Sequence, residues 1–357
     1  LLAGTVGSVS AQSLKDAKAA MAEEQYDKAK SILQNLVAKK ATVGENYFYL
    51  GQIHLVNDKI DSAALAFQTG ITNDPKDQLN NVGLGIVDLL KGNQSAAESK
   101  FTTATAGLGK KDYLPLYYIG RAYNKAAKPD YTKAIEYLTQ AKAKNPKDAL
   151  IPVALGDSYV GLNENSQAYV NYRDALNIDP NLLDAKISQA VITRRAQAYD
   201  VALEQLTALS QEFSTYAPIY RELAETYHLS SLKAPEDQYR SINDKALENY
   251  KKYLSLTGDV SLEAKTRYAD FLVYTASYDE LKKVSAEIAA APGADPKVFR
   301  YLGYTAYNQD KDYAKAAEYM NTLFTKVQPE RLIPRDYLYA GLANLSAGDP
   351  IKGKELL

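Results

Sequence analysis

The chain has 357 residues, no cysteine, and 42 basic against 43 acidic side chains, which gives a formal net charge of −1. The lack of cysteine excludes disulfide bonds. The near-neutral balance argues against a nucleic-acid-binding protein, because such proteins usually carry a basic stripe.

The first eleven residues are apolar and rich in small side chains, and they end in Val9-Ser10-Ala11. Small residues at these positions suit cleavage by a signal peptidase before Gln12. We therefore expect residues 1–11 to be the remnant of a signal peptide and the protein to be an exported, periplasmic protein of a bacterium. The alternative is a frayed leader on a cytoplasmic protein. The segment is too short to span a bilayer.

Small residues recur along the rest of the chain at a spacing close to 34. The steps from Gly51 to Gly85, Gly120 and Gly156 are 34, 35 and 36 residues long. The series continues with Ala190, Ala224, Ala269, Gly303 and Gly341. A period of this size indicates stacked helical hairpins. We divide residues 12–357 into units that start near residues 13, 44, 78, 113, 149, 183, 217, 262, 296 and 334, the last of them truncated.

Within a unit, a second small residue follows about twelve positions after the first, and a large side chain follows four positions later. In the unit that starts near residue 149 these residues are Gly156, Ala168 and Tyr172. Steps of three and four residues place side chains on one helix face. The paired small residues then let two antiparallel helices approach closely. Pro75 and Pro146 indicate hairpin ends, because proline cannot continue a helix.

This pattern resembles the tetratricopeptide repeat (TPR). Two of the best-matching units contain Tyr47, Leu50, Gly51, His54, Ala63, Phe67, Gly70 and Pro75, and Leu155, Gly156, Tyr159, Ala168, Tyr172, Ala175 and Pro180. The resemblance covers residues 14–357 and implies an all-α, right-handed superhelical solenoid of about ten stacked antiparallel hairpins. The first and eighth units depart from the pattern. The last unit shows no polar cap, so we expect the natural chain to continue.

In TPR proteins the first helix of each unit lines a concave face. Carried over by register, the resemblance places the following candidate partner-binding residues in this groove: Phe48, Leu55, Val82, Ile86, Leu89, Tyr117, Arg121, Asp157, Arg194, Arg221, Glu225, Arg300, Tyr304 and Tyr307. The early positions are apolar and the later ones charged, which predicts an apolar trough for a helix or peptide and a polar part that orients it. The alternative is that residues such as Val82 and Ile86 only pack against neighbouring helices.

Some TPR proteins hold a peptide's C-terminal carboxylate with lysine and asparagine at fixed groove positions. The pairs Tyr117-Arg121 and Val153-Asp157 do not match that pattern, which argues against this subtype.

The seventh unit carries about ten additional residues between Ala224 and Ala246. Pro235 followed by two acidic residues is typical of a helix start. We expect the insertion at 230–243 to lengthen both helices of its hairpin, with the turn near Lys233 and Ala234. A functional contact and neutral drift are the two alternatives for this insertion.

The sequence predicts no catalytic, cofactor-binding or metal site. Of the two histidines, His54 is expected in the core and His228 at the surface. The glycines at Gly83 and Gly85 lack the third glycine of a dinucleotide-binding fingerprint. An enzyme is therefore not expected.

We predict a non-enzymatic scaffold or adaptor that binds a peptide or helix of a partner protein in its groove, as part of an envelope complex. The sequence does not identify the partner. One alternative is a solute- or glycan-binding envelope protein that uses the groove aromatics Tyr117, Tyr304 and Tyr307. Another is a repeat domain of a larger protein, with an effector domain after residue 357.

Overall fold

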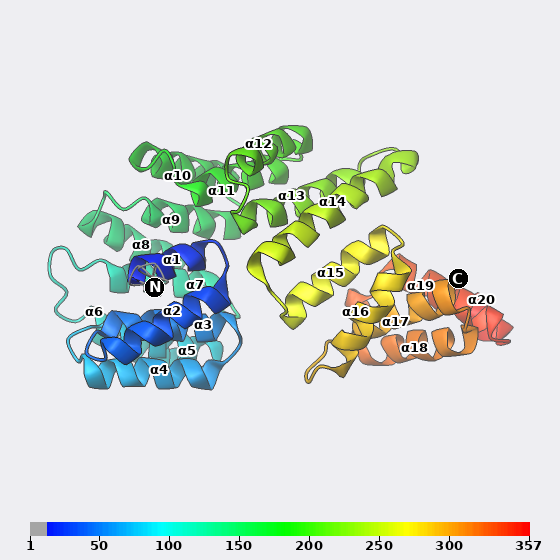
Figure 1. Cartoon of the computed structure of the whole chain (residues 1–357), viewed down its shortest axis with the longest axis horizontal. Coiled ribbons are helices and arrows are strands. Elements are labelled where there is room, and N and C mark those ends of the chain that lie inside the picture. The colour runs from blue at the N-terminus through cyan, green and yellow to red at the C-terminus, as the bar shows by residue number, and fades with distance from the viewer. Residues whose placement is uncertain (1–12) are drawn as a thin grey trace, which may run out of the picture. The chain divides into compact units, whose positions relative to one another are not determined.

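The computed structural model describes residues 13–357, and this part of the chain is all-α (Figure 1). It contains twenty α-helices, which pair into successive antiparallel hairpins, and no strand occurs among the described residues. The all-α solenoid of stacked hairpins that the sequence predicts is thus confirmed. The predicted signal-peptide remnant at residues 1–11 lies outside the described part.

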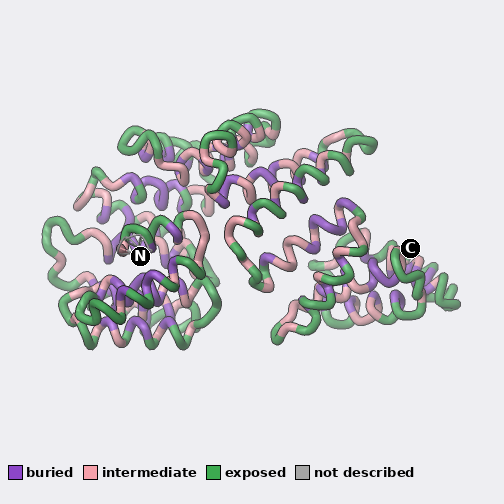
Figure 2. Tube along the Cα trace, in the orientation of Figure 1, coloured by how far each residue is buried: buried purple, intermediate pink, exposed green. Residues whose placement is uncertain are grey.

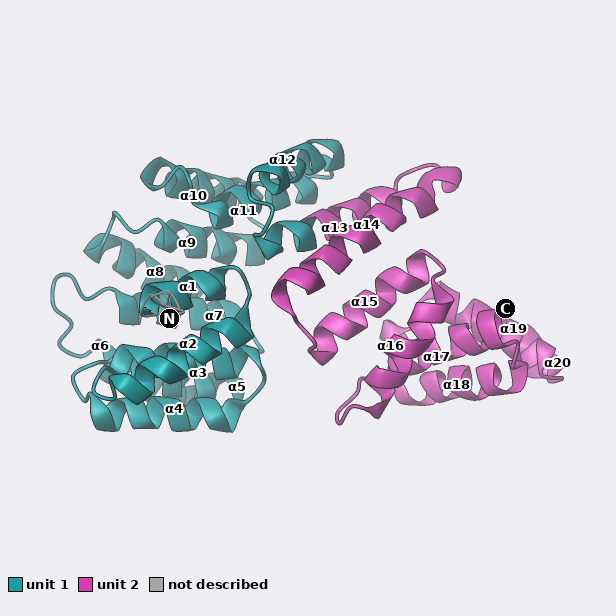
Figure 3. Cartoon of the chain, viewed as in Figure 1, with its two compact units in different colours: residues 1–222 teal, residues 223–357 magenta. Residues whose placement is uncertain are grey.

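The helices form two compact units, divided between Glu222 and Leu223 (Figure 3). Unit 1 holds six complete hairpins and the start of α13. Its helices are α1 (Leu14–Ala22), α2 (Tyr26–Lys39), α3 (Gly44–Val56), α4 (Ile60–Asn73), α5 (Leu79–Leu90), α6 (Gln94–Thr105), α7 (Leu114–Lys125), α8 (Tyr131–Lys144), α9 (Leu150–Gly161), α10 (Asn165–Ile178), α11 (Leu183–Arg195) and α12 (Tyr199–Glu212).

Unit 2 takes in the rest of α13 and all helices that follow. These are α13 (Ala217–Ser231), α14 (Glu236–Thr257), α15 (Leu262–Tyr274), α16 (Tyr278–Ala290), α17 (Val298–Thr305), α18 (Tyr313–Lys326), α19 (Pro334–Ser346) and α20 (Pro350–Leu356). A short π-helix (Ala306–Asp310) continues α17, and a 3-10 turn (Pro329–Arg331) precedes α19. The first helices of successive hairpins also pack on one another. This holds from α3 to α11 in unit 1 and from α15 to α19 in unit 2.

The recurring small residues sit where the two helices of a hairpin touch. A methyl group on Gly51 would overlap the ring of Phe67, and one on Gly156 would overlap the ring of Tyr172. Gly303 meets Met320 in the same way. Each large residue is fully or almost fully buried, and Figure 2 shows that buried positions recur along the helices of both units. The repeat is therefore a packing repeat, in which the small residue leaves room for the large one.

Two departures from the regular spacing have visible structural causes. Gly120 and Ala134 are two residues further apart than usual, and the extra residues lie in the loop between α7 and α8. Gly303 and Ala316 are one residue further apart, and here the chain forms the π-helix. A π-helix joins residues i and i+5 instead of i and i+4, so one π-turn takes up one additional residue.

The insertion in the seventh hairpin lengthens both of its helices, as predicted. Helix α13 has 15 residues and α14 has 22, and the turn between them follows Ser231 and ends at Pro235. Glu236 and Asp237 lie in the first turn of α14, where acidic side chains complement the helix dipole.

His228 is buried, so its predicted surface position is wrong. Its Nδ1 lies 2.9 Å from Oδ1 of Asn243, whose amide group donates to Ser231 and to a backbone carbonyl. Its ring stacks on Tyr274 at 4.1 Å between centroids. Asn243 belongs to the insertion and is fully buried. The inserted residues thus supply the partner that lets a polar ring enter the core.

Stability is expected to fall as His228 gains a proton. Burial lowers the pKa of His228 below its ordinary value of about 6.5. As the pH falls through that value, the unfolded chain binds a proton that the folded chain does not. The stability that the neutral ring of His228 contributes is therefore complete above about pH 6.5 and is lost as the pH falls below that value. We expect urea unfolding at about pH 7.5 and about pH 5.5 to show a smaller pH effect in His228→Gln than in the wild type.

His54→Gln is the matched control for this measurement, because His54 is the other histidine of the chain and is only half-buried. Burial also lowers the pKa of His54, so this control shows how much of the pH effect comes from a histidine that is only half-buried. An equal pH effect in His228→Gln and the wild type would show that the buried ring is not responsible.

Candidate functional site

A pocket with room for about 220 Å³ lies on the first helices of three consecutive hairpins in unit 1. We call it the unit 1 trough. Helices α3 and α5 supply Gln52, Leu55, Val56, Ile86, Leu89 and Leu90. Helix α7 and the residue after it supply Tyr118, Arg121, Ala122, Lys125 and Ala126.

Helical periodicity places these side chains on one wall. Gln52 and Leu55 are three residues apart on α3, and Ile86 and Leu89 are three apart on α5. Because α3 packs on α5 and α5 on α7, the three faces join into one surface. Val56 is 48% exposed and Leu90 37% exposed, so part of this apolar surface is open to solvent.

Two cations stand beside the apolar wall. The guanidinium of Arg121 lies 5.5 Å from the ring centre of Tyr117 and 5.9 Å from that of Tyr118. The hydroxyl of Tyr118 bonds that of Tyr49 at 2.6 Å, which fixes the ring that supports Arg121. Lys125 follows one turn later and is exposed. The charge of Arg121 is the largest cause of a lowered pKa at Lys125.

The structure brings four of the predicted groove residues together in the unit 1 trough: Leu55, Ile86, Leu89 and Arg121. Lys125, Tyr118, Val56 and Leu90 also line it but were not predicted. Lys125 could have been found from the register, because it lies four residues after Arg121 on the same helix.

Three other predicted groove residues belong to the core. Phe48 and Val82 are fully buried, and Tyr117 is 6% exposed. Phe48 packs against the rings of Tyr118 and Phe67. These positions are therefore corrected from groove surface to interhelical packing, which was the stated alternative for Val82.

Two of the three predicted arginines of unit 1, Arg194 and Arg221, have acidic partners inside the unit. Arg194 pairs with Glu222 at 2.8 Å, and Arg221 pairs with Glu222 at 3.2 Å. Arg221 also reaches Glu24 at 2.5 Å, in the turn between α1 and α2. This contact joins residues 197 positions apart, so the first hairpin of unit 1 comes back to its last helix. Both arginines thus hold the unit together.

Asp157 keeps an exposed carboxylate on α9. Its Oδ1 accepts a hydrogen bond of 2.8 Å from the hydroxyl of Tyr172. Asp157 remains available at the surface of unit 1, outside the unit 1 trough.

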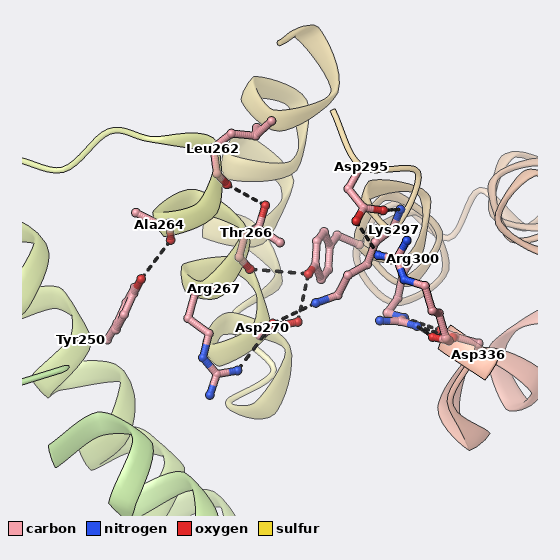
Figure 4. A network of polar contacts seen from close by, with 12 residues as sticks. Tyr250, Leu262, Ala264, Thr266, Arg267, Asp270, Asp295, Lys297, Arg300 and Asp336 are labelled. Carbon is pink, nitrogen blue, oxygen red and sulfur yellow. Dashed lines mark hydrogen bonds and ion pairs between the residues drawn. The ribbon is translucent and has the colours of Figure 1, made fainter. Parts of the chain in front are cut away.

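In unit 2 the predicted groove residue Glu225, and other charged residues near it, form ion pairs between successive hairpins. Glu225 on α13 binds Arg267 on α15 through two bonds of 2.6 Å. Asp270 on α15 accepts from Lys297 at 3.0 Å and from Tyr301 at 2.9 Å (Figure 4). These bonds link each hairpin to the next.

Arg300 and Tyr304 were also predicted to line the groove, but both side chains are buried in unit 2. Arg300 on α17 binds Asp336 on α19 through two bonds of 2.6 Å, and both side chains are buried (Figure 4). Tyr304 is fully buried and donates to the same carboxylate at 2.8 Å. Tyr307 is half-buried against Tyr313 and Tyr339.

The described residues contain no group of three or more His, Cys, Asp or Glu side chains that could hold a metal ion. Within the same part of the chain, no helix is both long and apolar enough to cross a membrane.

Comparison with known proteins identifies the fold. No protein-family model matches the sequence, and no curated protein matches it either. Among solved structures, the human IFIT1 dimer with m7Gppp-AAAA is 14% identical, covers 96% of this chain and 87% of its own, and has a TM-score of 0.54. The chain therefore has the fold of TPR-like helical-repeat proteins.

Two further solved structures match at lower scores. Cut9 in the APC/C Cut9-Hcn1 hetero-tetramer is 18% identical, with 72% of this chain and 48% of that chain covered and a TM-score of 0.44. PilF of Pseudomonas aeruginosa is 16% identical, with 64% and 97% covered and a TM-score of 0.40. These two matches add nothing to the conclusion on the fold.

Proposed function

We propose that this chain is a non-enzymatic scaffold that binds a peptide or a helix of a partner protein in the unit 1 trough. The observation that carries the proposal is the apolar wall of the trough, in which Val56 and Leu90 are exposed and Leu55, Ile86 and Leu89 are half-buried. Large side chains of this kind are normally buried, and a contiguous exposed patch of them marks a site of interaction. The TPR-like fold supports the same reading, because helical-repeat scaffolds typically bind protein or RNA.

The alternative of a glycan-binding protein is less well supported. Sugar recognition by stacking needs exposed aromatic rings, but Tyr117 and Tyr304 are buried in the hairpins. Of the three aromatic residues considered for this role, only Tyr307 keeps a half-exposed ring.

Site-specific photo-cross-linking in the native host tests the proposal. A benzophenone amino acid replaces Leu89 in the unit 1 trough, and in a matched control it replaces Leu65, which is 69% exposed on α4. We expect a discrete cross-linked protein from position 89 and none from position 65. Equal products from both positions, or none from position 89, would contradict the proposal.

We further propose, from the composition of residues 1–11, that the protein is exported by a bacterium. The same cross-linking strain tests this by cell fractionation. Recovery of the protein and its adduct in the periplasmic fraction, with Gln12 as the first residue of the mature chain, is the expected result. Recovery in the cytoplasmic fraction would contradict it.

A further inference from the structure

The charges of the unit 1 trough are unbalanced. Neither Arg121 nor Lys125 forms an ion pair within the described residues, whereas Arg194 and Arg221 in the same unit both do. Asp157 attracts both trough cations from beyond ion-pair distance and already accepts a bond from Tyr172. Two like charges one helical turn apart repel each other.

The lowered pKa of Lys125 reflects this repulsion, since the charge of Arg121 is its largest cause. An anion between the two cations would relieve the repulsion and raise the pKa of Lys125 again. Two neighbouring cations without an ion pair of their own thus favour a negative charge at this site.

A buried hydrogen-bond donor lies in the same wall. Nε2 of Gln52 is buried and has no hydrogen-bond partner among the described residues. A buried donor without an acceptor destabilises the free protein. An acceptor oxygen brought in by a ligand would satisfy it, so the trough offers three donor groups beside an apolar surface.

Resting on the proposed function, we infer that the partner segment carries an acidic side chain next to a large apolar side chain. The apolar side chain lies against Leu55, Ile86 and Leu89, and the carboxylate lies between Arg121 and Lys125. The volume of about 220 Å³ is below the roughly 300–1,000 Å³ of pockets that enclose a small-molecule ligand, and it suits one or two side chains.

A nucleic acid fits this surface less well than an acidic peptide. Binding along a phosphate backbone needs a row of cations, with each neutralised phosphate adding to the affinity. The unit 1 trough has two cations and a wall of aliphatic side chains. Base stacking also needs exposed rings, whereas Tyr118 in this wall is 9% exposed.

Peptide libraries of defined chemistry test the inference on the full chain. The probe is a fluorescent decapeptide library, acetylated and amidated at its ends, with a fixed central Leu-Glu. Companion libraries carry Leu-Gln, Ala-Glu, or Leu-Gln with a free C-terminal carboxylate. We expect Leu-Glu to bind at least about tenfold more tightly than the others, as a charged hydrogen bond would provide.

Variants assign the effect to the two cations. Arg121→Gln with Lys125→Gln is expected to remove the preference for Leu-Glu over Leu-Gln, and Lys125→Gln alone to reduce it. Lys125 is exposed, so the single variant is expected to fold even if the double one does not. The control variant Lys39→Gln with Lys40→Gln removes the same charge from exposed positions at the end of α2 and should keep the preference.

The remaining outcomes contradict different parts of the inference. Equal binding of Leu-Glu and Leu-Gln would overturn the acidic chemistry but leave the peptide-binding function standing. Preference for the free C-terminal carboxylate would move the anion from a side chain to a chain end. Binding of a short 5′-triphosphate RNA that depends on Arg121, without peptide binding, would replace the peptide with a nucleic acid. No binding of any probe would also reject it, whereas the function itself is judged by cross-linking from position 89.

Discussion

Replacing Arg300 with methionine is expected to lower the free energy of unfolding by about 3–5 kcal/mol. Asp336 is fully buried and its carboxylate accepts two bonds from Arg300, one from Tyr304 and one from the backbone amide of Ile333. Methionine would keep much of the side-chain volume but leave the buried charge without its cation. Breaking a buried pair from one side costs this much because the remaining charge stays desolvated.

Arg331→Met, in the 3-10 turn that precedes α19, is the matched control. Arg331 pairs with Asp295 at 2.5 Å, but both side chains are about half exposed. An exposed ion pair contributes only about 0–1 kcal/mol. Urea unfolding of both variants gives the difference, and hydrogen exchange of α17 and α19 shows where stability is lost. If Arg300→Met cost no more than the control, the pair would not be holding α17 to α19.

The fold could be predicted because it depends on contacts that repeat at a fixed distance along the chain. Gly51 meets Phe67 and Gly156 meets Tyr172 across the same interval of sixteen residues. A size pattern of this kind is visible in the sequence, since the contact needs only a small residue and a large one. The order of the hairpins then follows from the period.

The pairing of charged residues between hairpins could not be predicted in this way. Arg300 and Asp336 lie 36 residues apart on neighbouring first helices, and Arg194 and Glu222 lie 28 apart. A charged side chain at such a position can turn toward a ligand or toward the next helix, and its residue type is the same in both cases. The result depends on whether the neighbouring helix offers an opposite charge within reach.

Arg121 is a charged residue for which the neighbouring helices offer no opposite charge within ion-pair distance. It stands at another of the predicted groove positions, but its side chain lies over the rings of Tyr117 and Tyr118 and forms no ion pair within the described residues. It lines the wall of the unit 1 trough. Partner binding there stays a prediction until the cross-linking and peptide measurements are made.

Gly156→Leu is expected to destabilise the fifth hairpin by at least about 1–3 kcal/mol, which is the usual cost of overpacking a core. Even a methyl group on Gly156 would overlap the ring of Tyr172, which is only 2% exposed. The hydroxyl of Tyr172 is also bonded to Asp157 at 2.8 Å, so a shift of the ring would strain that bond. Ser166→Leu, at an exposed position of α10, is the control and should stay within about 0.5 kcal/mol of the wild type.

A double-mutant cycle identifies the contact that causes the loss. Tyr172→Ala removes the ring and is costly by itself, because it opens a cavity of the kind that costs about 3–5 kcal/mol for a large aromatic residue. Leucine at position 156 should partly fill that cavity. Adding Gly156→Leu to Tyr172→Ala should therefore cost less than adding it to the wild type, or even restore stability. If leucine cost the same with and without the ring, the small residue at position 156 would not be there to make room for Tyr172, and the packing explanation of the repeat would fail at this hairpin.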